Sequence, residues 1–462
     1  YRGSDSAGVA LTAPGMDHVE VRKKAGRLAN LIEDVERKPM PMATVGIGHT
    51  RWATNGVPND INAHPHTSQD GKVAIIHNGI IENASQLRLD LQTEGYRFSS
   101  ETDTEVAAKL LGKISEKIVE ETGKPDLFKA VRRLARMLEG AFTILATDCR
   151  QPGIVVGARH DSPLVVGLGE GENFLGSDVA AFVAYTKRAM EIDQDQAVMV
   201  SADKVVVSDF MGNIVADPKT YTVDWDASAA EKGGWDSFMD KEIHEDPAAV
   251  QRTLLGRLDE NGNINLDEVR IDEHDFKAID KIIVIACGTA AYAGMVAKYA
   301  IEHWVRIPVE VELAHEFRYR DPILTPRTLV VAISQSGETM DTLMALRHAR
   351  EQGSKVLAIC NTQGASIPRE SDAVLYTHAG PEVAVASTKA FVAQITAAYL
   401  LGLYLAQVKG AMFRDEIHQV LDSLKDMPRK IQWVLDTQPK TIQAAAERMV
   451  NANSFLFLGR HV

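Results

Sequence analysis

The hydrophobic pattern of the chain changes character about half-way along. In residues 1–221, short β-like runs such as VAIIHNG (73–79) and FTILATD (142–148) alternate with Gly, Pro, Asn and Asp. Two stretches between these runs, 104–121 and 126–138, have the apolar spacing of helices. Together these features predict a strand-rich first domain of the α+β kind, with a few helices.

Beyond residue 275 the pattern becomes an apolar strand followed by a long helix, repeated several times. The expected strands are continuous Val, Ile and Leu runs at 281–287, 308–313, 328–334, 355–361 and 373–377. Helices are expected at 290–304, 338–352 and 388–408. Strands that are apolar on both faces and alternate with helices are typical of a parallel sheet covered on both sides. We therefore predict a doubly wound α/β domain here.

These patterns divide the 462 residues into four predicted parts. They are a first domain (1–222), a charged interdomain linker with some structure of its own (223–275), the α/β domain (276–430) and a short C-terminal part (431–462). Within the last part, NSFLFLGRHV has the pattern of the first strand and turn of a second α/β unit. Since the chain also opens on Tyr1 rather than Met, we expect it to be a fragment.

Composition and charge narrow the function classes. At 45% hydrophobic and 24% charged residues the chain is expected to be soluble and globular, and its net charge of -13 disfavours nucleic acid and anionic membranes as partners. The apolar stretch 390–406 contains Gln394 and Thr396, so we predict a buried helix rather than a membrane span. The three cysteines are far apart, which favours reduced thiols in a cytoplasmic protein over a disulfide or metal framework.

The loop after the strand 328–334 is the first candidate site. It carries Ser334, Gln335, Ser336 and Thr339 where a parallel strand ends and a helix begins, a place where helix N–H groups bind anions. By itself the loop is equally compatible with Ser336 as a simple helix N-cap. Two further turns shift the balance, Gly288-Thr289 and the run from Ala386 to Lys389, because three hydroxyl-bearing turns in one sheet favour a phosphorylated polyhydroxy ligand.

In the first domain, a Gly-, Pro- and Asn-rich loop follows Arg51 and Trp52. Arg51 has the planar fork that binds a carboxylate in two-point fashion, and Trp52 can form a wall or lid. Taken in isolation, however, the pair is better explained by a surface Arg beside a core Trp. The histidines nearby suggest a metal, but without a cysteine partner they are better explained as structural groups. They are His49, His64, His66 and His77.

Two more motifs in this domain have alternative interpretations. Asn78-Gly79 is the strongest short-range signal for a tight hairpin turn, yet an Asn amide beside a Gly N–H also makes a sensible oxyanion hole. Thr102 and Glu105 have the spacing of a capping box, in which Glu105 reaches back to the cap. Asp103 takes no part in such a capping box, so its carboxylate could accept a ligand's ammonium group.

At this point the motifs as a set resemble a known family. YRGSDSAG, HTRWATNG, NAHPH, HNGIIEN and SETDTE resemble the glutaminase domain of class II amidotransferases, which are N-terminal nucleophile hydrolases with a layered αββα fold. KEIHEDP, ACGTAAYAG, EFRYRDP, SQSGET, NTQGASIPRESD and VASTKAF resemble the sugar isomerase (SIS) domain of the glutamine:fructose-6-phosphate amidotransferases, also called glucosamine-6-phosphate synthases. The resemblance covers nearly the whole chain.

The resemblance implies a role for each candidate residue. In the first domain, Arg51 would hold the carboxylate of glutamine and Asp103 its ammonium group, Trp52 and Thr54 would shape and close the site, and Asn78 and Gly79 would stabilise the oxyanion. In the second, the phosphate of fructose 6-phosphate would be bound by Thr289, Ser334, Gln335, Ser336 and Thr339. Ser387 and the backbone near Val385 would contact sugar hydroxyls, with Lys389 as a charged neighbour.

The resemblance also implies an activity: glutamine hydrolysis, internal passage of ammonia past Trp52, and conversion of fructose 6-phosphate to glucosamine 6-phosphate by a cytoplasmic homodimer without cofactor or metal. The family's N-terminal cysteine nucleophile and its Schiff-base lysine are not among these residues, so the 462-residue chain alone is expected to be inactive. Ser4, Asn55 and Ala290 depart from the family's usual residues. A non-enzymatic sugar-phosphate-binding module and a different class II amidotransferase are the alternatives.

Overall fold

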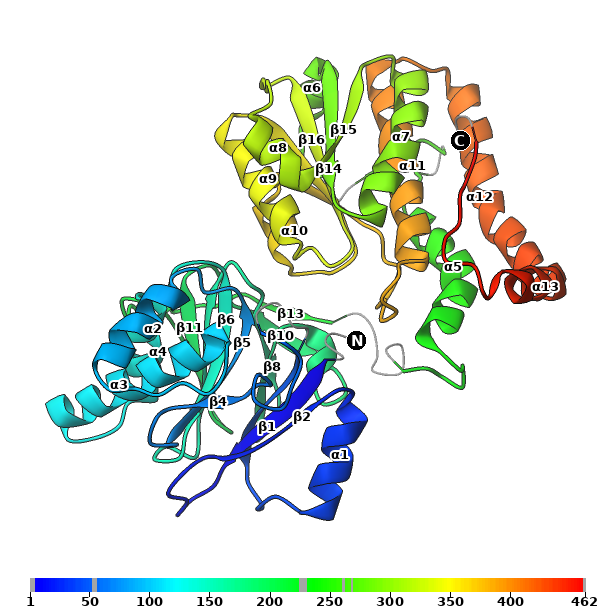
Figure 1. Ribbon diagram of the computed structural model, residues 1–462. Helices are drawn as coiled ribbons and strands as arrows, with labels where there is room; N and C mark the ends of the chain where they lie inside the picture. Colours follow the sequence, from blue (N-terminus) through cyan, green and yellow to red (C-terminus); the bar gives the residue numbers. More distant parts are fainter. Residues whose placement is uncertain (1–4, 52–55, 224–230, 260–261, 267–268, 460–462) are drawn as a thin grey trace. The chain divides into compact units, whose positions relative to one another are not determined.

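The computed structural model describes residues 5–51, 56–223, 231–259, 262–266 and 269–459 (Figure 1). The chain divides into two compact units, Tyr1–Ala227 and Ser228–Val462. Each unit has its own hydrophobic core, and each is described separately below.

Unit 1 is built on three antiparallel sheets. The largest has the order β12-β11-β7-β6-β5-β4, with bounds β4 (His66–Thr67), β5 (Val73–Gly79), β6 (Phe142–Asp148), β7 (Val155–His160), β11 (Gln196–Val200) and β12 (Val205–Asp209). The second is β2-β1-β3, formed by β1 (Ser6–Thr12), β2 (Glu20–Ala25) and β3 (Val45–Arg51). The third is β13-β10-β8-β9, formed by β8 (Val165–Leu168), β9 (Asn173–Gly176), β10 (Arg188–Glu191) and β13 (Thr220–Thr222).

Helices complete the layers of unit 1. The apolar faces of α3 (Asp103–Thr122) and α4 (Leu127–Ala135) pack on the six-stranded sheet, with α2 (Ala84–Thr93) beside α3 (Figure 1). On its other face this sheet packs against strands of the two smaller sheets, and α1 (Leu28–Arg37) lies against β2. A 3-10 turn covers 179–181. The predicted αββα layering is confirmed.

Unit 2 contains the predicted parallel sheet. Its order is β15-β14-β16-β17-β18, and every neighbouring pair is parallel. The strands are β14 (Lys281–Ala286), β15 (Val309–Leu313), β16 (Thr328–Ser334), β17 (Lys355–Cys360) and β18 (Ala373–Tyr376). Because helices cover both faces, the central strand β16 is buried at every position, which explains its unbroken apolar sequence.

The helices of unit 2 lie on the two faces of this sheet. One face packs against α7 (Thr289–Val305) and α11 (Lys389–Lys409), and the other against α8 (Ala314–Arg320), α9 (Met340–Glu351) and α10 (Ser366–Glu370) (Figure 1). By length and composition α11 is the one described helix able to cross a membrane, but it packs into the core, as the sequence predicted. α8 and α10 were not predicted.

Two parts of unit 2 differ from the sequence-based division. The expected linker 223–275, for which some structure was predicted, contains α5 (Phe238–Leu254) and the first residues of α6 (Glu273–Ala278), but α5 packs against α11 and α12 (Arg414–Thr437). After α13 (Pro439–Met449), residues 454–459 form no strand, although NSFLFLGRHV predicted one. A strand needs a neighbour for its backbone hydrogen bonds, and among the described residues none pairs with this segment.

Candidate active site

The first candidate site forms at the end of β3, where Arg51 is buried. Its side chain is 4% exposed, and its Nη2 donates to the Gly56 carbonyl at 3.3 Å. Burial lowers the pKa of Arg51, while the negative charges of Asp103 and Asp5 oppose this shift. The pKa of Arg51 therefore responds to the charge of Asp103, and the two residues carry the charges that an amino acid's carboxylate and ammonium group require.

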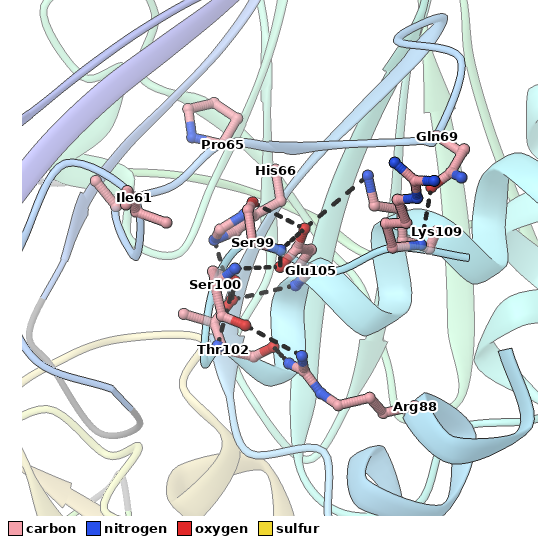
Figure 2. Close-up of polar contacts among 12 residues, drawn as sticks. Ile61, Pro65, His66, Gln69, Arg88, Ser99, Ser100, Thr102, Glu105 and Lys109 are labelled. Atoms are coloured by element: carbon pink, nitrogen blue, oxygen red, sulfur yellow. Dashed lines mark hydrogen bonds and ion pairs between the residues drawn. The ribbon is translucent and has the colours of Figure 1, made fainter. Parts of the chain in front are cut away.

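Asp103 opens α3, and both oxygens of its carboxylate have partners. The Thr104 hydroxyl donates to Asp103 Oδ1 at 3.4 Å, and His77 Nδ1 lies 3.8 Å from the same oxygen. The Ile81 N–H donates to Asp103 Oδ2 at 2.9 Å, and Thr102 caps the helix by accepting from the Glu105 N–H at 3.2 Å. The predicted cap is thus confirmed. The predicted return contact is wrong, because the Glu105 carboxylate accepts from the N–H groups of Ser99 and Ser100 rather than from the cap (Figure 2).

Arg88 braces the loop that leads to Asp103. From α2 its guanidinium donates to the carbonyls of Ser100 (3.1 Å) and Thr102 (2.9 Å), as Figure 2 shows. The central carbon of this guanidinium, Cζ, also lies over the Phe98 ring, 4.5 Å from the ring centroid. Two fixed carbonyls on either side of residue 101 leave the loop little freedom, so Arg88 holds Asp103 in place without touching it. Sequence reasoning did not find this residue.

Lys23 performs a similar task for the loop 56–65. Its ammonium donates to the carbonyls of Ile61 (3.0 Å), Ala63 (2.7 Å) and Pro65 (3.2 Å), and burial lowers its pKa to about 8. One side chain on β2 therefore ties three backbone positions of a segment that has no regular structure. Nothing in the sequence marked this lysine.

Asn78 and Gly79 are the last two residues of β5, opposite Thr143 and Phe142 of β6. The hairpin-turn interpretation is therefore wrong, because both residues are paired within a strand. The His49 Nε2 lies 2.8 Å from Asn78 Oδ1. Burial lowers the pKa of His49 to about 4, so its ring is neutral and donates to this oxygen, which turns the Asn78 NH₂ group away from His49. Gly79 has φ +123°, a value that favours glycine.

The four histidines form a buried cluster around this strand end. The His49 and His64 rings stack with centroids 4.4 Å apart, His66 Nε2 bonds Thr102 Oγ1 at 3.0 Å, and His77 Nδ1 bonds Thr104 Oγ1 at 3.0 Å. Burial lowers the pKa of all four. Among the described residues they are not part of any group of three potential ligands close enough to share an ion, which favours a structural role.

Trp52 and Thr54, which the sequence assigned to this site, lie outside the described residues. Among the cysteines, Cys149 is the one in unit 1, and it lies far from this site. The Cys149 N–H bonds the Lys72 carbonyl just before β5 begins, so it lies about 20 Å from Asn78 at strand spacing. Cys287 and Cys360 belong to unit 2.

The second candidate site is the loop between β16 and α9. Ser334 ends the strand, and its hydroxyl lies 3.1 Å from that of Thr339 and accepts from the Gly337 N–H at 3.0 Å. Ser336 accepts from the Glu338 N–H at 3.2 Å. The N-cap of α9 is Thr339 rather than Ser336, and its hydroxyl makes no capping bond. Simple capping by Ser336 therefore does not explain this loop.

The other residues assigned to this site occupy neighbouring strand ends. Thr289 is the exposed first residue of α7, after β14, and follows Gly288, whose φ of +59° favours glycine. Gln335 holds the next strand end through its carbonyl, which accepts from the Asn361 N–H at 3.3 Å. Because β14, β16 and β17 are adjacent and parallel, their carboxyl ends gather these groups along one edge.

Acidic side chains hold the loop that leads into α11, by accepting hydrogen bonds from its backbone N–H groups. Glu242 of α5 accepts from the N–H groups of Val383 (2.5 Å) and Ala384 (3.1 Å), and Glu382 accepts from those of Thr388 and Ala390, both at 3.0 Å. This support was not predicted. Its only sequence signal is the acidic motif KEIHEDP, whose partners lie more than a hundred residues away.

Within this loop Val385 is 82% exposed, so its backbone is open to a ligand. The Ser387 Oγ is buried and makes no hydrogen bond with a described residue. Lys389 is buried too, and its ammonium group forms an ion pair with the Glu245 carboxylate of α5 at 2.5 Å. Lys389 therefore fixes α11 to α5, and its charge is already paired.

The comparisons with known proteins find one domain in each of the two structural units. Residues 36–211 match the glutamine amidotransferase domain, and residues 276–404 match the SIS domain. The chain is 62% identical over 462 residues to glutamine–fructose-6-phosphate aminotransferase [isomerizing] of Corynebacterium diphtheriae, which covers all of this chain and 73% of the relative. The chain belongs to the glutamine–fructose-6-phosphate aminotransferase family.

Other family members are similarly close. The proteins of that name from Streptomyces coelicolor and Mycobacterium tuberculosis are 58% and 54% identical, and this chain covers 74% of each. A solved structure of the C-terminal domain of the aminotransferase from Francisella tularensis is 38% identical, with a TM-score of 0.48 over 50% of this chain and 64% of that one. The family predicted from the motifs is thus confirmed, and its members are enzymes.

Proposed function

We propose that this protein catalyses the glutamine-dependent amination and isomerisation of fructose 6-phosphate to glucosamine 6-phosphate. Family membership over the whole chain carries this proposal, because both domains and their order agree with it. Unit 1 supports a glutaminase through Arg51, Asp103 and Asn78, and unit 2 supports a sugar-phosphate site through the loop 334–339.

In unit 1, we assign Arg51 to the carboxylate of glutamine and Asp103 to its ammonium group. Asn78 Nδ2 and the Gly79 N–H are assigned to the oxyanion of the tetrahedral intermediate. His49 supports this role because it holds Asn78 Oδ1, which leaves the donor end of the amide for the developing charge. Trp52 and Thr54 are assigned to closing this site and to the passage of ammonia.

In unit 2, Thr289, Ser334, Gln335, Ser336 and Thr339 are assigned to the phosphate, and Ser387 with the Val385 backbone to sugar hydroxyls. Hydroxyl and N–H donors at a helix N-terminus suit a phosphate that is held without a cation. We further propose a cytoplasmic homodimer that needs neither cofactor nor nucleic acid. The net charge of -13 supports the absence of nucleic acid, and light scattering of the purified protein tests the dimer.

Asn78→Ala tests the glutaminase assignment in the complete gene product. Loss of one oxyanion donor typically lowers kcat by about 10²- to 10³-fold. We therefore expect glutamine-dependent formation of glucosamine 6-phosphate and glutamine hydrolysis to fall together by about that factor, while fructose 6-phosphate still stabilises the protein against heat.

Asn83→Ala is the matched control, because it removes another hydrogen-bonded Asn amide only five residues from Asn78. The Asn83 amide bonds the backbone of Met137 and Glu139. If Asn83→Ala loses as much activity as Asn78→Ala, the loss is structural. If the complete wild-type gene product forms no glucosamine 6-phosphate, the proposed function itself is wrong.

A further inference from the structure

Three potential metal ligands converge at the carboxyl ends of the strands of the parallel sheet. Cys287 Sγ, a ring nitrogen of His315 and a carboxylate oxygen of Asp341 all lie within 4.8 Å of one another. Cys287 follows β14, His315 is the second residue of α8 after β15, and Asp341 is the second residue of α9 after β16. These strands are neighbours in the sheet, so their carboxyl ends bring the three side chains together.

We propose that these three side chains form an open site for a divalent transition metal of the zinc class, with water in the fourth position. Thiolate, imidazole and carboxylate are all zinc ligands, and bonds of about 2.0–2.3 Å place ligand atoms roughly 3.3–3.8 Å apart in a tetrahedron. His315 and Asp341 are exposed, so small side-chain rotations close the remaining distance. The thiolate favours zinc over magnesium or calcium.

The geometry favours a metal over a hydrolytic Cys-His-Asp triad. In such a triad the carboxylate bonds the ring nitrogen that faces away from the nucleophile, so the imidazole separates thiol and carboxylate. Here the Asp341 carboxylate lies within 4.8 Å of the Cys287 thiol itself, so the imidazole does not separate the two groups. Among the described residues, the other polar contacts of the Cys287 and His315 side chains are long: Thr342 Oγ1 to Cys287 Sγ is 3.9 Å, and His315 to Glu316 is 4.0 Å.

Cys287 is also the one cysteine of the three that a solute reaches. Cys149 and Cys360 are buried, whereas Cys287 is partly exposed. Burial raises the pKa of Cys360 to about 12, which keeps it protonated and unreactive at neutral pH, and burial also raises the pKa of Cys149. In the 462-residue chain, the rate at which a thiol reagent modifies the native protein therefore reports on Cys287.

The proposal is tested by adding Zn²⁺ to chelator-treated protein and measuring bound metal and the rate of thiol modification. We expect about one Zn²⁺ per chain and protection of Cys287, and Co²⁺ in its place should give a sulfur-to-cobalt charge-transfer band. Cys287→Ser should abolish the band. His315→Ala and Asp341→Asn should each weaken Zn²⁺ binding by at least the tenfold typical of losing a group that merely supports a ligand.

His303→Ala on α7 and Asp422→Asn on α12 are matched controls on exposed surface and should bind as wild type does. Thermal unfolding confirms that each variant is folded. The proposal is overturned if wild-type protein binds no Zn²⁺, or if the His315 and Asp341 variants bind Zn²⁺ and protect the thiol as well as wild type.

Discussion

The two candidate sites are stabilised in different ways. In unit 1 the functional side chains are buried or half-buried and held by partners from other elements, as His49 holds Asn78 and the Ile81 N–H holds Asp103. In unit 2 the hydroxyls of Ser334 and Ser336 accept from N–H groups of their own loop, 334–339, and the loop is also bonded to the segment after β17, whose Ile367 N–H donates to the Gly337 carbonyl at 2.9 Å. The first site therefore depends mainly on distant residues for its shape, whereas the second combines bonds within its loop with bonds to the segment that follows the next strand.

Among the substitutions that test this comparison, Arg51→Lys should have the largest effect, and the effect should be confined to unit 1. Lysine keeps the charge but loses the planar two-point grip on a carboxylate. Loss of one hydrogen bond to a charged group costs about 1.5 to 3 kcal/mol, so we expect kcat/KM for glutamine to fall about 10- to 100-fold. Steady-state kinetics with the complete gene product measure this. Unchanged glutamine kinetics, or an equal loss of fructose 6-phosphate binding, would contradict the assignment.

Thr339→Ala and Ser336→Ala test whether the unit 2 loop binds phosphate or only stabilises itself. Each removes one hydroxyl, and we expect each to weaken fructose 6-phosphate binding by about 0.5 to 3 kcal/mol. The ligand-induced rise in Tm, compared with wild type, measures this. Ser371→Ala is the control, since its hydroxyl bonds the Ile367 carbonyl at 2.7 Å in the same unit. A normal ligand-induced shift in Thr339→Ala would argue strongly against phosphate binding there.

Arg88→Gln sharpens the claim that the unit 1 site depends on supporting residues. Loss of the bonds to the Ser100 and Thr102 carbonyls should loosen the loop before Asp103 and raise KM for glutamine several-fold, about tenfold at most. Arg88→Lys, which retains one donor, should recover part of the loss. Arg132→Gln is the control, because Arg132 also lies over a ring (Phe128, 4.6 Å) and bonds one carbonyl. Equal KM changes in both variants would mean that Arg88 is merely structural.

Asp246→Asn should give the smallest effect, a change in the pH dependence of stability in unit 2. Burial, with Glu382 and Glu242 nearby, raises the pKa of Asp246 from 3.8 to about 7. The folded state thus holds this proton more tightly than the unfolded state, so its contribution to stability is present at low pH and is lost as pH rises through about 7.

We therefore expect Asp246→Asn to be more stable relative to wild type at pH 8 than at pH 5. Urea unfolding at both pH values measures the difference, with exposed Asp422→Asn as the control. A difference that is the same at both pH values would show that Asp246 is ionised throughout.

The sequence by itself determined the parallel sheet, its strand ends and the family. Strands buried on both faces must be continuously apolar, so the runs at 281–287 and 328–334 marked β14 and β16 to within one residue. Helix capping at Thr102 was also readable, since a cap is a local interaction. Local rules failed at Asn78-Gly79, where pairing with β6 overrides the turn preference of the two residues.

Tertiary structure decided which residues support the sites. Arg88, Lys23 and Glu242 all act on backbone groups that lie far from them in sequence, and no local spacing signals such a contact. The same holds for Cys287, His315 and Asp341, which come together only because three parallel strands end at one edge. Sequence periodicity encodes the burial of an element, but the partners of its polar groups depend on how the elements pack.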